Sequence, residues 1–240
     1  MATGNSELAT RATSPINPPL EGRGQPQSTT VLCGPSSKSA ERISGRGLGL
    51  TVLVLLAAAV SPSHAGWQDN AAPSDVQRLA QLSESRAKGL QEASRAAPSD
   101  LAAIQSVLQS GTVSASAGAL KGKWRCRMMK LGGLTPAIVY SWFSCRIGDS
   151  HGALAFEKLS GSQRTSGTLY PDGQGYVYLG ASYVTGEKPH AYSGTGAAAG
   201  AAATPDDQIG HLSLLYDGRA RLELPYPTQE STFDVIELKR

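Results

Sequence analysis

The 22 residues from Gln163 to Val184, QRTSGTLYPDGQGYVYLGASYV, carry the pattern that decides the fold. Two alternating runs of apolar and polar residues, at 163–170 and 176–184, flank the turn sequence Pro171-Asp172-Gly173. Alternation with a period of two places successive side chains on opposite faces of a strand. The stretch therefore predicts two antiparallel strands joined by a tight turn.

The same pattern continues on both sides of this hairpin. Turn signals at 148–150 and 217–218 separate further runs that are typical of short strands. These strands are expected at 123–130, 137–147, 153–159, 210–216, 219–224 and 232–238. Eight short antiparallel strands can close into a small barrel, which removes exposed sheet edges. The tract 193–207 is rich in Ala and Gly, and we expect it to form a loop.

A helical segment is predicted ahead of the strands, at 66–111. The sequence Ala-Pro-Ser-Asp occurs at residue 72 and again at residue 97. In each copy the Ser is expected to cap the first turn of a helix, and the Asp suits its positive end. Apolar residues follow at helical spacing, and Pro98 interrupts a single long helix. We expect a helical hairpin formed by helices at about 75–96 and 100–109.

The expected fold class is therefore α+β. An N-terminal helical hairpin would precede an antiparallel eight-stranded β-barrel at 120–240.

The residues before Gly66 predict export. Arg42 and Arg46 precede an apolar run at 47–60, and Ser63-His64-Ala65 follows it. This order is typical of a secretory signal peptide at 42–65, cleaved after Ala65. A membrane anchor would need about 20 apolar residues, so no membrane span is expected after cleavage. Residues 1–41 are interpreted as a disordered or mis-annotated leader, because they show no hydrophobic periodicity.

Composition limits the partners of the exported chain. Five of the 22 basic residues and three of the 19 acidic residues precede Gly66, so the formal charge falls from +3 to about +1. We therefore expect no nucleic-acid partner. A local basic cluster is interpreted as a solvated strand face, with an anion site as the alternative. Its members are Lys121, Lys123, Arg125, Arg127 and Lys130.

The two cysteines that follow the predicted cleavage site are Cys126 and Cys145. Both lie in predicted strands, and an oxidising compartment favours one disulfide between them. Closing a loop of about 20 residues would stabilise the fold by roughly 3 kcal/mol. Two buried free thiols are the alternative.

No motif specifies a reaction, a cofactor or a metal. Ser150 and His151 are adjacent in sequence, so their side chains point apart and cannot form a nucleophile–base pair. The histidines after residue 65 show no metal-ligand spacing. We therefore favour a non-enzymatic protein with no catalytic residues, no cofactor and no metal. The alternative is a hydrolase whose polar residues converge only in three dimensions, with Glu157, Arg164 and His211 as candidates.

Aromatic residues are the strongest candidates for binding. They either fill the barrel core as cross-strand pairs or line a pocket at the mouth of the barrel. In the second interpretation the ligand contacts are Trp124, Trp142 and Tyr140, with Arg164 as a polar anchor.

Several stretches resemble one family across nearly the whole exported chain. They are Gly122-Lys-Trp-Arg-Cys-Arg, Lys130-Leu-Gly-Gly-Leu, Tyr140-Ser-Trp-Phe-Ser-Cys, 156–164 and 230–238. This is an uncharacterised family of exported alphaproteobacterial proteins, the domain of unknown function 4893. The resemblance implies periplasmic residence and brings no activity. More weakly, Gly122-Lys123-Trp124 is similar to the G-x-W that opens lipocalin-like barrels and small periplasmic inhibitor barrels.

Together these features favour a non-enzymatic periplasmic barrel that binds or inhibits. Its partner would be an envelope protein or a small apolar ligand. The alternatives are the hydrolase described above and a structural component of the envelope.

Overall fold

The computed structural model describes residues 66–194 and 203–240. The predicted leader at 1–41 and the predicted signal peptide at 42–65 lie outside these residues, as does most of the tract 193–207.

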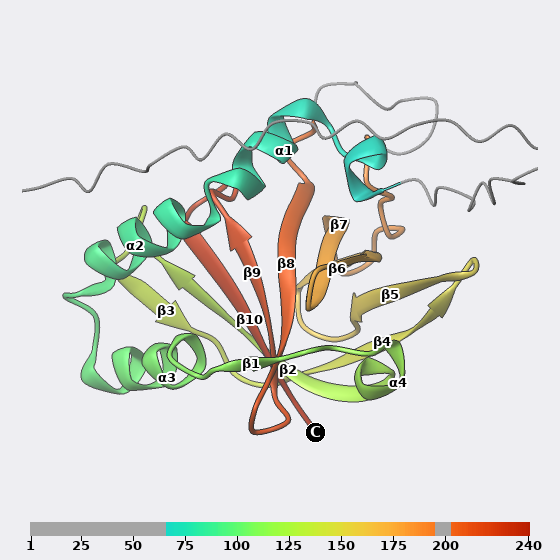
Figure 1. Cartoon of the computed structure of the whole chain (residues 1–240). Coiled ribbons are helices and arrows are strands. Elements are labelled where there is room, and N and C mark those ends of the chain that lie inside the picture. Colours follow the sequence, from blue (N-terminus) through green and yellow to red (C-terminus); the bar gives the residue numbers. More distant parts are fainter. Residues whose placement is uncertain (1–65, 195–202) are drawn as a thin grey trace, which may run out of the picture. The chain divides into compact units, whose positions relative to one another are not determined.

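The described residues form a closed antiparallel β-barrel of eight strands (Figure 1). Each strand pairs with the next around the barrel, and the β8–β9 and β10–β2 pairings complete the circle. The strands are β2 (Gly122–Leu131), β4 (Phe143–Ser150), β5 (Ala153–Lys158), β6 (Gln163–Asp172), β7 (Gly175–Val184), β8 (Asp207–Leu215), β9 (Ala220–Pro225) and β10 (Phe233–Lys239). Closure leaves no free edge in the barrel, which confirms the architecture predicted from the alternating pattern.

The predicted strand at 137–147 is two strands. β3 (Ala137–Val139) pairs with the end of β2, and β4 pairs with its beginning. Val139 of β3 pairs with Met129, and Phe143 of β4 pairs with Cys126. Three residues (140–142) lie between β3 and β4 at this point, whereas only two residues of β2 (127 and 128) lie opposite them. This extra residue is a bulge, which interrupts the pairing and bends the strand. A further short strand, β1 (Thr112–Val113), extends the sheet beside β8.

The interior of the barrel holds the main core. Inward side chains of all eight strands pack together, and Phe156 meets Tyr178 edge-on at 5.9 Å between ring centroids. Gly167 and Gly180 face each other across β6 and β7, beside the Tyr178 ring. Two glycines are required there because a Cβ on Gly167 would lie 2.3 Å from the Leu179 carbonyl oxygen.

Cys126 and Cys145 form the disulfide predicted from the sequence. They lie on the neighbouring strands β2 and β4, with 5.8 Å between their Cα atoms. Both side chains are buried in the barrel core. The bridge therefore ties the first strand of the barrel to the next one along the sheet.

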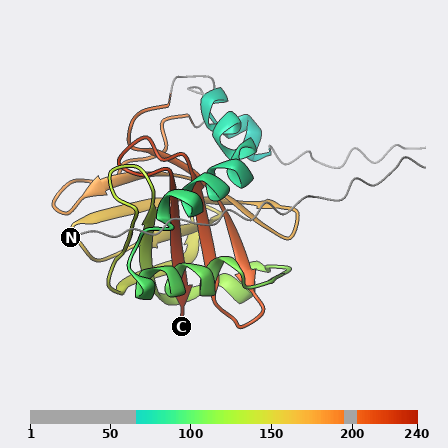
Figure 2. The same cartoon turned by 90° about the vertical axis from the view of Figure 1, so that its left-hand side faces the viewer.

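Four helices of the described residues pack on the outside of the barrel (Figures 1 and 2). They are the short 3-10 helix η1 (Trp67–Asn70), α1 (Pro73–Ala80), α2 (Leu82–Ala93) and α3 (Pro98–Leu108). The single-turn α4 (Ala117–Leu120) lies at one end of the barrel, and its Leu120 enters the interior core. α1 contacts β8 and β9, α2 contacts β2, β9 and β10, and α3 contacts β3. A hairpin in which two helices pack on each other is not confirmed. The apolar faces of α2 and α3 pack on the barrel rather than on each other. They contact four residues on the outer faces of β2 and β10, namely Met129, Leu131, Phe233 and Val235.

The helix starts lie two residues before the predicted ones. α1 and α3 begin at Pro73 and Pro98, with Ala72 and Ala97 at the N-cap, and no side chain caps either helix. Proline suits the first helical position because its missing N–H is not needed there. Asp75 is completely buried and accepts hydrogen bonds from Arg78 and from Tyr192, 2.5 Å away. The acidic residue therefore anchors the helix to the fold.

None of the helices in the described residues is long and apolar enough to cross a membrane.

Candidate functional site: the open end of the barrel

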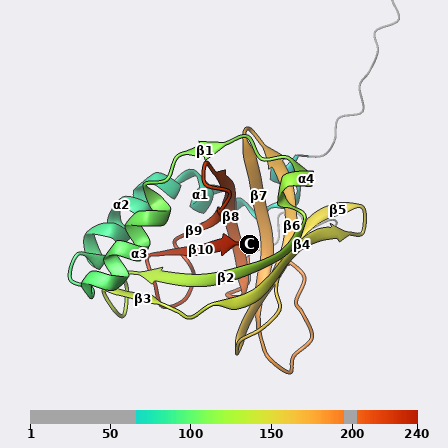
Figure 3. The ribbon, with the colours of Figure 1, turned by 90° about the horizontal axis from the view of Figure 1, so that it is seen from below.

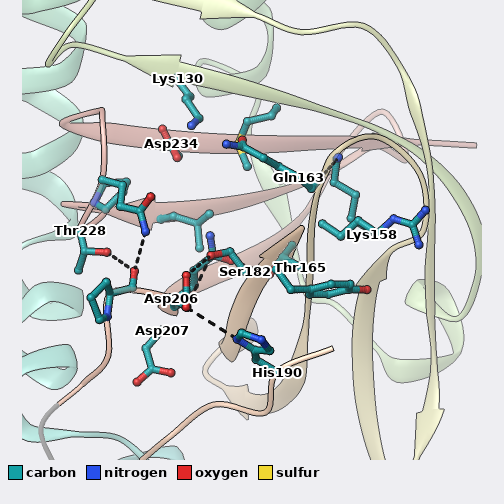
Figure 4. Close-up of a pocket in the computed structure, with 18 of the residues that line it drawn as sticks. Lys130, Lys158, Gln163, Thr165, Ser182, His190, Asp206, Asp207, Thr228 and Asp234 are labelled. Atoms are coloured by element: carbon teal, nitrogen blue, oxygen red, sulfur yellow. Dashed lines mark hydrogen bonds and ion pairs between the residues drawn. The ribbon is translucent and has the colours of Figure 1, made fainter. Parts of the chain in front are cut away.

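The two ends of the barrel differ. At one end of the barrel lies α4 (Figure 3). Its Leu120 belongs to the interior core and lies next to Trp124. At the other end a cavity of about 340 Å³ opens between the strand ends. We call this end the mouth. It is lined by the last residues of β2, β5, β7 and β9 and the first residues of β4, β6, β8 and β10, together with neighbouring loops (Figure 4).

The floor of the mouth is a hydrogen-bonded polar group. Thr165 is 2 % exposed, and its hydroxyl lies 2.6 Å from the Tyr178 hydroxyl and 2.5 Å from Gln208 Oε1. The single hydroxyl hydrogen of Thr165 serves Gln208 or the Ala181 carbonyl, so Tyr178 is the donor to Thr165. Burial raises the pKa of Tyr178 well above its ordinary value. Tyr178 therefore stays a neutral donor at any physiological pH.

One wall of the mouth carries a buried carboxyl group beside a lysine. Asp234 of β10 and Lys130 of β2 are directly opposite each other in the sheet, and both line the mouth (Figure 4). Lys130 also forms an ion pair with Glu230. Asp234 is 4 % exposed, and Ser231 Oγ donates a hydrogen bond to it over 2.6 Å. Burial raises the pKa of Asp234 to about 7, although the hydrogen bond and Lys130 act in the opposite direction.

The opposite wall carries a buried lysine with a different environment. Lys158, at the end of β5, is 5 % exposed, and its ammonium group lies 4.1 Å from the centre of the Phe143 ring. It donates hydrogen bonds to the carbonyl oxygens of Ser160, at 2.9 Å, and Gln163. Burial, assisted by the positive charge of Arg164, lowers the pKa of Lys158 to about 8. The group is thus a cation at neutral pH in a place that disfavours cations.

Two further basic side chains of the mouth lie beside carboxylates. Arg78 of α1 forms an ion pair with Asp75 at 2.6 Å. His190 Nδ1 lies 3.7 Å from Asp206, which also accepts a hydrogen bond from Ser182 (Figure 4).

The structure separates the four residues proposed as ligand contacts. Tyr140 and Arg164 line the mouth. Trp124 is 3 % exposed in the core near the closed end, where its indole N–H donates to the Leu120 carbonyl over 2.7 Å. Trp142 lies outside the barrel, with the Lys239 ammonium 4.1 Å from the centre of its ring. Ligand binding by these residues stays a prediction.

The three residues proposed for a hydrolase do not converge. Arg164 is at the mouth, whereas Glu157 faces outward from β5 and pairs with Arg146 at 2.8 Å. His211 faces outward from β8, 3.9 Å from Asp172 and under α1. Within the described ranges no three His, Cys, Asp or Glu side chains come close enough together to hold a metal ion.

Sequence reasoning overlooked the inward polar residues of the mouth. The alternation contained the signal, because Lys158 shares its face of β5 with Phe156 and Leu154, which are core residues. By the same parity Asp234 shares its face of β10 with Ile236 and Leu238. A charged residue in phase with core residues is a candidate for a buried functional group.

Comparison with known families identifies the chain. The profile of one family, the domain of unknown function DUF4893, matches residues 67–238, so the chain belongs to that family. No curated protein and no solved structure matches the chain.

Proposed function

We propose that this member of the DUF4893 family is a non-enzymatic binding protein of the periplasm that holds a small organic molecule in the mouth of its barrel. The observation that carries the proposal is the cavity of about 340 Å³ at the open end. Ligand pockets typically span about 300–1,000 Å³ and combine an apolar lining with a few placed polar groups. Small barrels of lipocalin type hold one small ligand in this way.

The lining of the mouth supports this role. Met128, Phe143 and Leu224 give it an apolar side, and the side chains of Thr165 and Gln208 give it a fixed polar floor. Because the floor residues are hydrogen-bonded to each other and to the backbone, they are held in place before a ligand arrives. A preorganised cavity loses less conformational entropy on binding than a mobile one.

The polar contacts favour binding over nucleophilic catalysis. In a serine hydrolase a histidine lies between the nucleophilic hydroxyl and a carboxylate and acts as the base. Here the Ser182 hydroxyl hydrogen-bonds directly to Asp206, and His190 lies beside the same carboxylate rather than between the two groups. The Thr165 hydroxyl bonds to a tyrosine, an amide and a carbonyl group.

Two features support a periplasmic location. The pattern at 42–65 is typical of a cleaved signal peptide. The disulfide between Cys126 and Cys145 fits an oxidising compartment.

Native mass spectrometry of the protein recovered from the periplasm tests the proposal. We expect a chain that begins at Gly66 and carries an additional non-covalent mass, which is lost under denaturing conditions. Replacing Ser182 by Phe would place a ring in the mouth and should abolish the additional mass. The matched control is Ser144→Phe, on the exposed outer face of β4, which should keep it.

A wild-type protein without additional mass, and without a thermal shift from any member of a small-molecule library, would contradict the proposal. The barrel would then be expected to bind a protein rather than a small molecule. An inhibitor of an envelope enzyme or a structural envelope component would be the next hypothesis to examine.

A further inference from the structure

The basic side chains of the mouth differ in their partners, although four carboxyl groups also line it, those of Glu187, Asp206, Asp207 and Asp234. Of the five cationic or potentially cationic side chains that line it, those of Arg78, Lys130 and His190 have a carboxylate partner. Lys158 and Arg164 have none among residues 66–194 and 203–240. The mouth therefore contains two positive charges that form no ion pair with a carboxylate of the described residues, and the charge of Arg164 acts on Lys158.

Lys158 is the more unusual of the two. A buried cation is costly unless an anion lies next to it, and lysines are rarely buried without one. Here the residue is 5 % exposed, and its ammonium group contacts two carbonyl oxygens and the face of the Phe143 ring. These groups hold the ammonium in position by their dipoles and leave its net charge in the mouth. The arrangement is suited to a ligand that brings the missing negative charge.

Arg164 adds a second, differently shaped donor. Its guanidinium group makes one long hydrogen bond, 3.4 Å from Nε to the Gly161 carbonyl, and its remaining N–H groups have no partner in the described residues. A guanidinium group presents a planar fork that suits the oxygens of a carboxylate or a phosphate. Its charge also contributes to the lowered pKa of Lys158. An anion between the two groups would relieve this repulsion.

The rest of the lining sets the shape of the ligand. Met128, Phe143 and Leu224 are apolar, and the opposite wall carries Asp234 and Lys130, of which Lys130 forms an ion pair with Glu230. A volume of about 340 Å³ has room for about eleven non-hydrogen atoms, if each takes roughly the 30 Å³ that water occupies, and the end of a longer chain would project out of the open mouth. A short apolar body with one charged end fits this lining.

We infer that the ligand of the mouth is a small amphipathic anion whose carboxylate or phosphate head group is bound by Lys158 and Arg164. The inference rests on the proposed function, namely that the mouth binds a small organic molecule, and specifies the chemical class of that molecule.

Three probes with the same apolar chain test the inference. Decanoate, decyl phosphate and decanol are titrated into the ligand-free mature protein at neutral pH, and binding is followed by calorimetry. We expect at least one anion to bind about tenfold or more tightly than decanol, because a charge-assisted hydrogen bond contributes more than a neutral one. The stronger of the two anions identifies the head group as a carboxylate or a phosphate.

Variants locate the head group. Lys158→Met keeps the length of the side chain and removes the charge, and we expect it to weaken binding of the preferred anion about ten- to a hundredfold while leaving decanol binding unchanged. Arg164→Gln should act in the same direction, and Lys158→Arg should restore most of the affinity. The control is Lys123→Met, which removes the same charge from the exposed outer face of β2. Thermal unfolding of each variant verifies that it folds.

The pH dependence gives a readout that a purely structural role of Lys158 would not change. Anion affinity of the wild type should fall as the pH rises above about 8, where the free ammonium group loses its proton. Lys158→Met should show no such fall.

Two results overturn the inference and can be told apart. If decanol binds as tightly as both anions, the head-group assignment is wrong and the binding function remains. If no probe binds and the protein from the periplasm carries no additional mass, the proposed function fails together with the inference.

Discussion

The buried carboxyl group of Asp234 should make the stability of this protein depend on pH. Its pKa is about 7 in the folded protein and 3.8 in an unperturbed carboxyl group, chiefly because burial disfavours the charged form. The folded state therefore binds the Asp234 proton more tightly than the unfolded state does. The contribution of Asp234 to stability is then greatest below about pH 4, falls as the pH rises from about 4 to about 7, and stays at the lower level above that.

The size of the effect follows from the two pKa values. The full difference corresponds to about 4 kcal/mol of unfolding free energy, and about 2.5 kcal/mol of it is lost between pH 5 and pH 8. Asp234→Asn keeps the shape of the side chain and an oxygen that accepts from Ser231, and it carries no charge at any pH. When the pH is raised from about 5 to about 8, the unfolding free energy of the variant should therefore increase by about 2.5 kcal/mol relative to that of the wild type.

Urea denaturation of both proteins at about pH 5 and about pH 8 measures this difference. Subtracting the unfolding free energies of the variant from those of the wild type at each pH removes the contributions of titrating groups that the two proteins share. Asp149→Asn, at a side chain that is 68 % exposed, is the matched control and should follow the wild type. Parallel profiles for Asp234→Asn and the wild type would refute the reasoning, and would show that Lys130 keeps the carboxylate charged inside the barrel.

Two further predictions concern the barrel itself. Replacing Cys126 and Cys145 together by Ala should lower the free energy of unfolding by about 3 kcal/mol, because the bridge joins residues 19 apart; an unchanged midpoint in urea would contradict this. Gly167→Ala should destabilise by roughly 1–3 kcal/mol or more, since its Cβ would lie 2.3 Å from the Leu179 carbonyl oxygen. Gly148→Ala, whose Cβ meets nothing within 4 Å, is the control for thermal unfolding, and equal losses in the two variants would disprove the steric argument.

The organisation of the barrel was largely predictable from the sequence, because strands carry a local signal. A half-buried strand alternates, and a turn such as Pro171-Asp172-Gly173 needs particular residues, so each strand can be recognised within its own segment. The prediction was wrong where two elements share one continuous run. The bulge between β3 and β4 depends on how both pair with β2, and β2 is a different segment of the chain.

The packing of the helices was less predictable. Periodicity identified helical segments and their apolar residues, and it did not identify the surface that receives them. α2 and α3 lie against the apolar outer faces of β2 and β10, which the sequence shows only as alternate positions of strands. Asp75 illustrates the same limit. An acidic residue near a helix start suggests interaction with the helix end, whereas here it is buried against Tyr192, 117 residues away in sequence.

The sequence by itself determined the strands, the cysteine pair and the membership of the family, since each of these is written in residues that lie close together in the chain. Only the tertiary structure decided which polar residues share the mouth. Lys158 and Asp234 come from strands far apart in sequence, and barrel closure makes them walls of one cavity. It also decided that Trp124 lies in the core and Trp142 outside, because the face of a strand that becomes the interior is fixed by closure of the barrel. Charge and burial are properties of an environment, and that environment is assembled from residues that only folding brings together.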